Sequence, residues 1–171
     1  MGALRDVLAP GLRIVFVGIN PGLRSAALGH HFAGPGNPFW RLLAAARLTP
    51  VLLRPDEDAR LAEFGLGITN LVARESRTAA ELTREELQRG AAILRRKLAR
   101  VRPKIVALTG LTIYQQLYPQ SKSRGPGAKP ETISGARVFV LPNPSGLNAS
   151  YPGFAQKLVW FEALRQLLDA G

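Results

Sequence analysis

The sequence predicts a single α/β domain of three layers, in which helices flank a central and mostly parallel β-sheet. Three observations support this class. Unbroken apolar runs at 14–17, 105–108 and 138–141 are typical of strands that are buried on both faces. Helical patterns with one apolar face stand between and after these runs. The 171 residues suffice for one substantial core without a shift in composition, so we expect residues 1–171 to form one domain.

The first strand, residues 14–17, leads into a tight turn with the sequence GINPG. Gly18 and Gly22 let the main chain turn sharply and approach a ligand closely, and Pro21 stiffens the turn. Asn20 is therefore expected at the carboxyl end of a central strand, where open α/β sheets bind ligands. The spacing fits neither the dinucleotide-binding glycine pattern nor the P-loop.

Residues 23–36 are expected to form a long loop over this strand end, before a helix with Asn37 as its N-cap and Pro38 at its first position. The loop brings four candidate side chains to the same region: Ser25, His30, His31 and Phe32. We interpret the two adjacent histidines as solvent-facing. The alternative is a role in the pocket, which would make activity fall as they become protonated.

Two shorter segments follow the first helix. Three acids at 56–58 are expected on the exposed first turn of a short helix that ends before Gly65, where they complement the helix dipole. Residues 67–72 form a short strand or extended segment, which would place Asn70 at another strand end. Spacing alone somewhat favours a turn-forming asparagine over a role in the site.

The clearest helix is predicted over 83–100, because Thr83 and Glu86 form a capping box ahead of apolar residues at helical spacing. Its exposed side and exit carry cations without an intervening acid: Arg89, Arg95, Arg96, Lys97, Arg100, Arg102 and Lys104. A solvated helix face and a surface that contacts phosphates are equally open interpretations.

The rest of the chain alternates strand and helix patterns: a strand at 105–108 that ends at Thr109, a short helix at 111–118, a strand-turn-strand unit at 132–141 and a last helix at 154–168. Residues 119–130 have the composition of a mobile basic loop, of the kind that nucleic-acid proteins order on phosphate.

A second turn, PNPSGLN at 142–148, follows the last strand. Neighbouring strands would bring it close to the first turn across a cleft. Leu147 is a bulky apolar residue among Pro, Ser, Gly and Asn. It either packs back onto the core or acts as a wedge between base steps, as in proteins that unstack a DNA duplex.

The charge balance points to a polyanionic partner. Lys and Arg number 23 against 12 Asp and Glu, a net charge of +11, and nucleic acid is the commonest polyanion. A membrane surface is the weaker alternative, because no helix combines a basic face with a bulky aromatic one. The absence of cysteine excludes disulfides and thiolate metal sites, and no run approaches a membrane span. We expect a cytoplasmic protein, associated with the nucleoid if its source is bacterial.

Four motifs together resemble a known family: VFVGINPGLRSA at 15–26, GNPFW at 36–40, GITNLV at 67–72 and LPNPSGLNA at 141–149. The chain is similar, over residues 8–168, to the mismatch-specific uracil/thymine DNA glycosylases of the uracil-DNA glycosylase superfamily. The resemblance implies the fold of the uracil-DNA glycosylases. It also implies an enzyme that flips uracil out of double-stranded DNA and hydrolyses its glycosidic bond, with preference for G·U mismatches. Thymine or modified pyrimidines are further candidate substrates.

The resemblance also implies roles for the first turn and loop. Asn20 matches the residue that positions the attacking water, and Asn70 ranks second for this role. Phe32 matches the aromatic residue that stacks on the flipped pyrimidine. Further residues of this part of the chain would line the pocket: Gly18, Ile19, Pro21, Gly22 and Ser25.

In the second turn, Asn143 matches the residue beside the leaving base, whose amide would stabilise negative charge on the pyrimidine, and Ser145 would contact substrate. Leu147 matches the wedge that fills the place of the flipped base. Gly146 and Asn148 would contact the widowed guanine.

An amide cannot accept a proton as a carboxylate does, so general-base help at Asn20 is largely absent and the enzyme is expected to be slow. Neither turn contains a lysine that would form a Schiff base, so we expect a monofunctional glycosylase. No cofactor or metal is expected, since two histidines on a loop make no ligand set. The expected state is a monomer.

Two other functions remain open. A catalytically silent module would use the same basic surface and wedge to bind mismatched DNA, although simple duplex binding needs no base pocket. A small-nucleotide hydrolase is disfavoured, because the sequence has neither a phosphate loop nor an evident carboxylate cluster for a metal.

Overall fold

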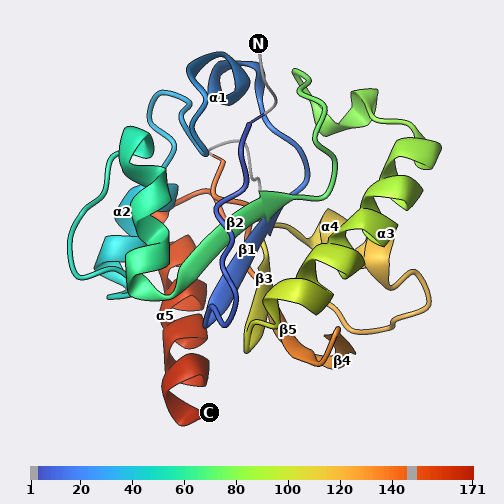
Figure 1. The fold of residues 1–171 in the computed structure, drawn as a ribbon. Coiled ribbons are helices and arrows are strands. Elements are labelled where there is room, and N and C mark those ends of the chain that lie inside the picture. Colours follow the sequence, from blue (N-terminus) through green and yellow to red (C-terminus); the bar gives the residue numbers. More distant parts are fainter. Residues whose placement is uncertain (1–3, 146–149) are drawn as a thin grey trace.

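The computed structural model describes residues 4–145 and 150–171 and contains one five-stranded sheet (Figure 1). The strands are β1 (Ile14–Gly18), β2 (Leu66–Asn70), β3 (Ile105–Leu108), β4 (Gly127–Ile133) and β5 (Ala136–Val140). Their order across the sheet is β2-β1-β3-β5-β4. Only β4 runs antiparallel to its neighbour, so the predicted α/β class with a mostly parallel sheet is confirmed.

The parallel strands end in register along one edge of the sheet. Gly18 at the end of β1 pairs with Asn70 at the end of β2. Leu108 at the end of β3 lies beside both Val17 of β1 and Val140 of β5. The residues that come directly after these four strands therefore lie at the same edge of the sheet, which is where ligands bind in sheets of this class.

Helices cover both faces of this sheet and give the domain three layers (Figure 1). One face packs against α3 (Arg84–Val101) and α4 (Leu111–Leu117). The other packs against α2 (Phe39–Ala45), α5 (Phe154–Ala170) and the 3-10 segment η1 (Pro55–Phe64). The two faces bury separate apolar clusters, and all residues of β1 are buried, as its unbroken apolar run predicts.

The capping box predicted for α3 is present. The Thr83 hydroxyl accepts a hydrogen bond from the Glu86 main-chain N–H at 3.1 Å, and Glu86 Oε1 accepts one from the Thr83 N–H at 3.0 Å. A short 3-10 turn, η2 (Ala79–Glu81), precedes it. This arrangement fixes the start of α3 beside the segment that leaves β2.

Three predicted boundaries were wrong. The expected loop at 23–36 contains a helix, α1 (Leu23–Leu28), which begins after Gly22 and ends at Gly29 in the left-handed conformation. The helix expected to include Pro38 begins one residue later, although Asn37 Oδ1 does accept a hydrogen bond from the Phe39 N–H at 3.0 Å. The basic loop expected over 119–130 is shorter, because β4 already begins at Gly127 and pairs with β5.

Neither outer edge of the sheet is a regular, fully unpaired strand. Beyond β2, Val7 forms an isolated antiparallel bridge with Ile68, with two N–H···O hydrogen bonds of 2.9 Å. At the other edge, β4 contains Pro130, which has no N–H, and its register with β5 shifts between Ala128 and Thr132.

Candidate functional site

A pocket of about 910 Å³ lies at the edge where the parallel strands end. Each of those strands contributes the residues that follow it. The segments that line the pocket are 18–25 from the end of β1, 76–79 after β2, 109–113 after β3 and 140–143 with Ser145 from the end of β5; the other contributors include His31, Phe32, Asn70, Gly125, Pro126, Ser150 and Tyr151.

All described residues to which the resemblance assigns a site role line this one pocket: Gly18, Ile19, Asn20, Pro21, Gly22, Ser25, Phe32, Asn70, Asn143 and Ser145. Of the two histidine candidates, His31 lines it and His30 does not. Gly146, Leu147 and Asn148 lie outside the described residues. The two turns do not follow adjacent strands, because β3 lies between β1 and β5. Thr109 and Gly110, which follow β3, therefore line the pocket as well.

The side-chain amide of Asn20 has a defined orientation. Its Nδ2 donates hydrogen bonds to the Arg74 main-chain carbonyl at 2.9 Å and to the Ser76 hydroxyl at 2.8 Å. Because a carbonyl can only accept, the nitrogen and not the oxygen must face Arg74. Ser76 in turn donates from Oγ to the Thr78 carbonyl at 2.7 Å, so its lone pair faces Asn20. Asn20 Oδ1 is thereby directed away from this segment.

The segment that holds Asn20 is itself attached to α3. Arg74 binds the Glu86 carboxylate through two hydrogen bonds of 2.7 and 3.0 Å. This guanidinium contact, with the Thr83 N–H, lowers the pKa of Glu86 from 4.5 to about 2. The main-chain N–H of Ser76 also donates to the Pro21 carbonyl at 3.2 Å, which joins the segment to the first turn.

Asn70 lies against the base of the same turn. A Cβ added at Gly18 would lie 2.6 Å from Asn70 Oδ1, closer than atoms of this kind approach in proteins. Only glycine at position 18 therefore leaves room for the Asn70 side chain in its present position. Asn70 is the last residue of β2 and lines the pocket, so it is not the turn residue that spacing alone favoured.

Phe32 is half-buried at the pocket and packs against the second apolar cluster. Its ring is stacked on Phe39, with centroids 4.1 Å apart and planes inclined by 21°. Phe39 is fully buried and makes edge contacts with Phe16, Trp40 and Phe161. Because Phe39 covers one face of the Phe32 ring, the opposite face is the one that can stack on a planar ligand.

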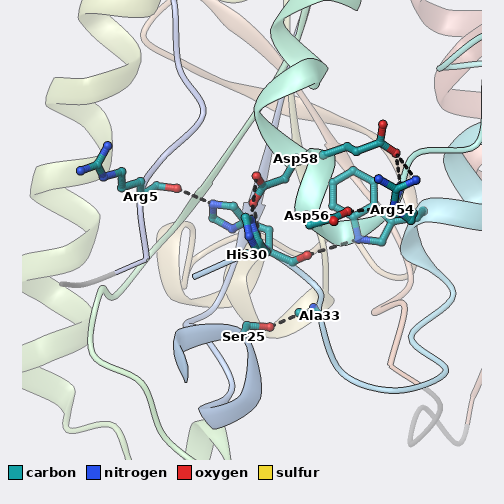
Figure 2. Close-up of polar contacts among 10 residues, drawn as sticks. Arg5, Ser25, His30, Ala33, Arg54, Asp56 and Asp58 are labelled. Atoms are coloured by element: carbon teal, nitrogen blue, oxygen red, sulfur yellow. Dashed lines mark hydrogen bonds and ion pairs between the residues drawn. The ribbon is translucent and has the colours of Figure 1, made fainter. Parts of the chain in front are cut away.

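The histidines were expected to face solvent, and this was wrong for His31, which is only 2% exposed. Its main-chain N–H donates to Asp58 Oδ2 at 2.9 Å, while His30 Nδ1 lies 3.3 Å from Asp58 Oδ1 (Figure 2). Asp58 was expected on the surface with its acidic neighbours and is instead buried. The contacts with His30 and His31 compensate for the loss of water around its carboxylate. Asp56 keeps the expected exposure and pairs with Arg54.

The Arg5 main-chain carbonyl identifies Nε2 as a protonated nitrogen of the His31 ring. Its Nε2 lies 2.7 Å from the Arg5 main-chain carbonyl, an acceptor, so Nε2 carries a proton. Burial lowers the pKa of the His31 imidazole below its usual value of 6.5, although the Arg5 carbonyl and the Asp58 charge oppose this shift.

In the second turn, Asn143 Oδ1 accepts a hydrogen bond from the Ser145 main-chain N–H at 2.9 Å. The contact fixes the local turn and the plane of the Asn143 amide. Asn143 therefore lines the pocket from the side of β5, while Asn20 and Asn70 do so from β1 and β2.

The charges at the pocket are of one sign. None of the described residues that line it is Asp or Glu, and its lining includes the exposed Arg24 and Arg77. A pocket of this kind suits an anionic ligand and provides no carboxylate base. The cations predicted along the 83–104 region do not line it.

The described residues hold no group of three or more His, Cys, Asp or Glu side chains placed to bind a metal ion. Within 4–145 and 150–171, no helix has both the length and the apolar character to cross a membrane.

Lys129 was expected in a mobile basic loop but is turned inward. Its Nζ donates to the Ser123 hydroxyl and to the carbonyls of Arg124 and Gly125 at 3.0, 3.0 and 2.6 Å. These contacts hold the loop that carries Gly125 and Pro126 to the pocket, and Lys122 and Arg124 remain exposed.

Sequence reasoning missed several functional candidates. Thr109 and Gly110 follow a buried strand, so the strand-end argument applied to Asn20 would have found them. Ser76 and Asp58 carry no local signal, since their partners are 56 and 27 residues away in the chain.

Comparison with known proteins agrees with this arrangement. The family model described as "Uracil DNA glycosylase superfamily" matches residues 5–167. The fold is similar to the solution NMR structure of a protein from Methanosarcina acetivorans that is provisionally assigned as a uracil DNA glycosylase. The TM-score is 0.65 at 20% sequence identity, and the match covers 98% of this chain and 97% of the other.

Proposed function

The chain belongs to the uracil DNA glycosylase superfamily, and from this premise we propose that it removes uracil from double-stranded DNA by hydrolysing the N-glycosidic bond. The observation that carries the proposal is the fixed amide of Asn20 in a pocket whose described lining contains no carboxylate. Such an amide can position a water molecule but cannot take its proton. This matches a reaction driven by departure of the base.

Asn20 Oδ1 accepts a hydrogen bond from the attacking water and directs a lone pair of the water oxygen at C1′. The bond from C1′ to N1 of uracil breaks and its electron pair leaves with the base, while the water oxygen bonds to C1′. The proton that this water loses passes to solvent. Uracil is a better leaving group than thymine, whose methyl group must also fit the pocket.

The base is recognised after it has left the helical stack. It stacks on the free face of Phe32, which Phe39 supports from behind. The Asn143 amide stabilises the negative charge that develops on a pyrimidine oxygen, and Asn70 assists in placing the water. The basic rim of the pocket, with Arg24 and Arg77, favours binding of the phosphate backbone.

The finer specificity is also part of the proposal. The protein prefers G·U mismatches, with Leu147 as the wedge and with Gly146 and Asn148 against the widowed guanine, and it acts as a monofunctional monomer in the cytoplasm. The sequence of the second turn supports the assignment of the wedge and of the contacts to guanine. Thymine and modified pyrimidines are weaker candidate substrates.

Single-turnover release of uracil from a duplex with one G·U pair tests the proposal. The intact protein is compared with Asn20→Ala, and Gln88→Ala on the exposed side of α3 serves as the control. We expect Asn20→Ala to slow release by about 10²-fold, because the attacking water is no longer positioned, while the control releases uracil at the normal rate.

Release that survives in Asn20→Ala would move the main catalytic role to another group, with Asn70 examined next. Binding of the duplex without release by any variant, the intact protein included, would favour the silent mismatch-binding module. Hydrolysis of free nucleotides but not of duplex DNA would contradict both.

A further inference from the structure

We propose that Asp58 is a positioning residue for Phe32, a role that rests on the proposed function of Phe32 as the stacking platform. Asp58 belongs to η1 and does not line the pocket. It acts through the main chain of the segment that carries Phe32. The inference therefore concerns how the platform is held and not which group touches the base.

The main chain at Phe32 requires such support. Its φ is +49°, in the left-handed region that non-glycine residues rarely adopt. A conformation of this kind costs free energy and persists only where the surroundings determine it. Removal of the surrounding contacts would let residues 31–33 relax and would change the direction of the Phe32 ring.

Three side chains from three different elements hold the main chain around Phe32: Trp40 and Ser25 bind the peptide groups on either side of it, and Asp58 binds the peptide group before these. Asp58 Oδ2 accepts from the His31 N–H at 2.9 Å. Trp40 on α2 donates from Nε1 to the His31 carbonyl at 3.2 Å. Ser25 on α1 accepts from the Ala33 N–H at 3.0 Å (Figure 2).

Asp58 has a special place among these three. Its carboxylate contacts two consecutive residues: Oδ1 lies 3.3 Å from His30 Nδ1, and Oδ2 accepts the hydrogen bond from the His31 N–H (Figure 2). The side chain of Asp58 is only 10% exposed. Without the carboxylate, the buried His31 N–H would lose its acceptor, which disfavours the present backbone conformation.

The expected consequence is a loss of preorganisation. Phe32 now presents one ring face to the pocket before any base arrives, so little ordering remains to be done when the base stacks. If residues 31–33 were loosened, Phe32 would have to become ordered while the base flips, and this ordering would cost free energy. The flipped state becomes less populated, while binding of an undamaged duplex is unaffected.

The test compares Asp58→Ala and Asp58→Asn with Asp56→Ala. Asp56 is in the same element, but its side chain is 58% exposed and it pairs with Arg54. Asp58→Asn keeps an oxygen that can accept from the His31 N–H, so it should rescue part of the loss. Hydrogen exchange at the amides of His31 and Ala33 measures, without DNA, how firmly the main chain of residues 31–33 is held.

We expect exchange at these two amides to become about tenfold faster or more in Asp58→Ala and to stay unchanged in Asp56→Ala. The maximal single-turnover rate should fall by about tenfold in Asp58→Ala and by about threefold in Asp58→Asn. Affinity for the same duplex without uracil should change by less than about twofold in both.

Combination with Phe32→Ala separates positioning from a general effect on stability. In that background, Asp58→Ala should alter the rate by less than about twofold, because the side chain that Asp58 positions is gone. An equal loss in both backgrounds would overturn the proposal, as would unchanged amide exchange. If the intact protein released no uracil, the proposed function would fail, and the exchange data alone would still decide whether Asp58 holds the segment.

Discussion

Asn20 is bound to the main-chain carbonyl of Arg74, 54 residues later in the chain, by a hydrogen bond of 2.9 Å from its amide nitrogen. The proposed water-positioning oxygen is thus oriented by a segment outside the turn that carries it. The same Arg74 reaches Glu86 on α3 with its side chain. The position of the Asn20 amide therefore depends on the attachment of residues 74–78 to the rest of the fold.

Ser76→Ala should reduce the rate of uracil release by about fivefold, because it removes one of the two acceptors of the Asn20 amide and such a bond contributes about 1 kcal/mol. Single-turnover kinetics with the G·U duplex measure the effect. The same substitution at Ser134, in the exposed turn between β4 and β5, is the control. A normal rate in Ser76→Ala would mean that the Arg74 carbonyl alone orients the amide.

Gly18→Ala should displace the Asn70 side chain, since the added Cβ would lie 2.6 Å from Asn70 Oδ1. We expect uracil release to slow by about tenfold, as it should in Asn70→Ala. In the double variant the loss should not exceed that of Asn70→Ala alone. Losses that multiply would show that Gly18→Ala disturbs the turn itself and not Asn70.

The lowered pKa of His31 predicts a loss of stability on acidification. Between the folded and unfolded pKa values the unfolded chain binds more protons, so stability rises with pH. The contribution is complete above the unfolded value of 6.5 and is lost as the pH falls below it toward the folded value.

Thermal unfolding between about pH 8 and pH 5 measures this loss. His31→Gln removes the titrating group and keeps an N–H donor near the Arg5 carbonyl, so its melting temperature should depend less on pH. A wild-type slope in His31→Gln would assign the pH dependence to another group.

Glu86 predicts a separate transition at lower pH. Its folded pKa of about 2 lies below the usual 4.5, so its contribution to stability is present above pH 4.5 and is lost as the pH falls toward 2. Glu86→Gln should be less stable than the intact protein at neutral pH, and the difference should shrink across this range. Denaturant unfolding at several pH values measures it, with Glu85→Gln on the same helical turn as the control. A constant difference would contradict the prediction.

The sequence was informative wherever a site residue follows a buried strand. Asn20, Asn70 and Asn143 were placed correctly at one edge because parallel strands end together, and the pattern of apolar runs predicts those ends. Asp58 and Ser76 could not be found in this way. Their roles arise from contacts between segments distant in the chain, and an acidic or hydroxyl residue in a turn has many exposed equivalents.

The edges of the sheet bear on how copies of the protein behave at high concentration. A free strand edge offers main-chain donors and acceptors to a strand of another molecule, and such pairing leads to aggregation. Here Val7 occupies part of the β2 edge, while Pro130 and the irregular register interrupt the β4 edge. The described sheet is therefore a poor template for intermolecular strand pairing, and its colloidal stability should persist at the concentrations needed for crystallisation or storage.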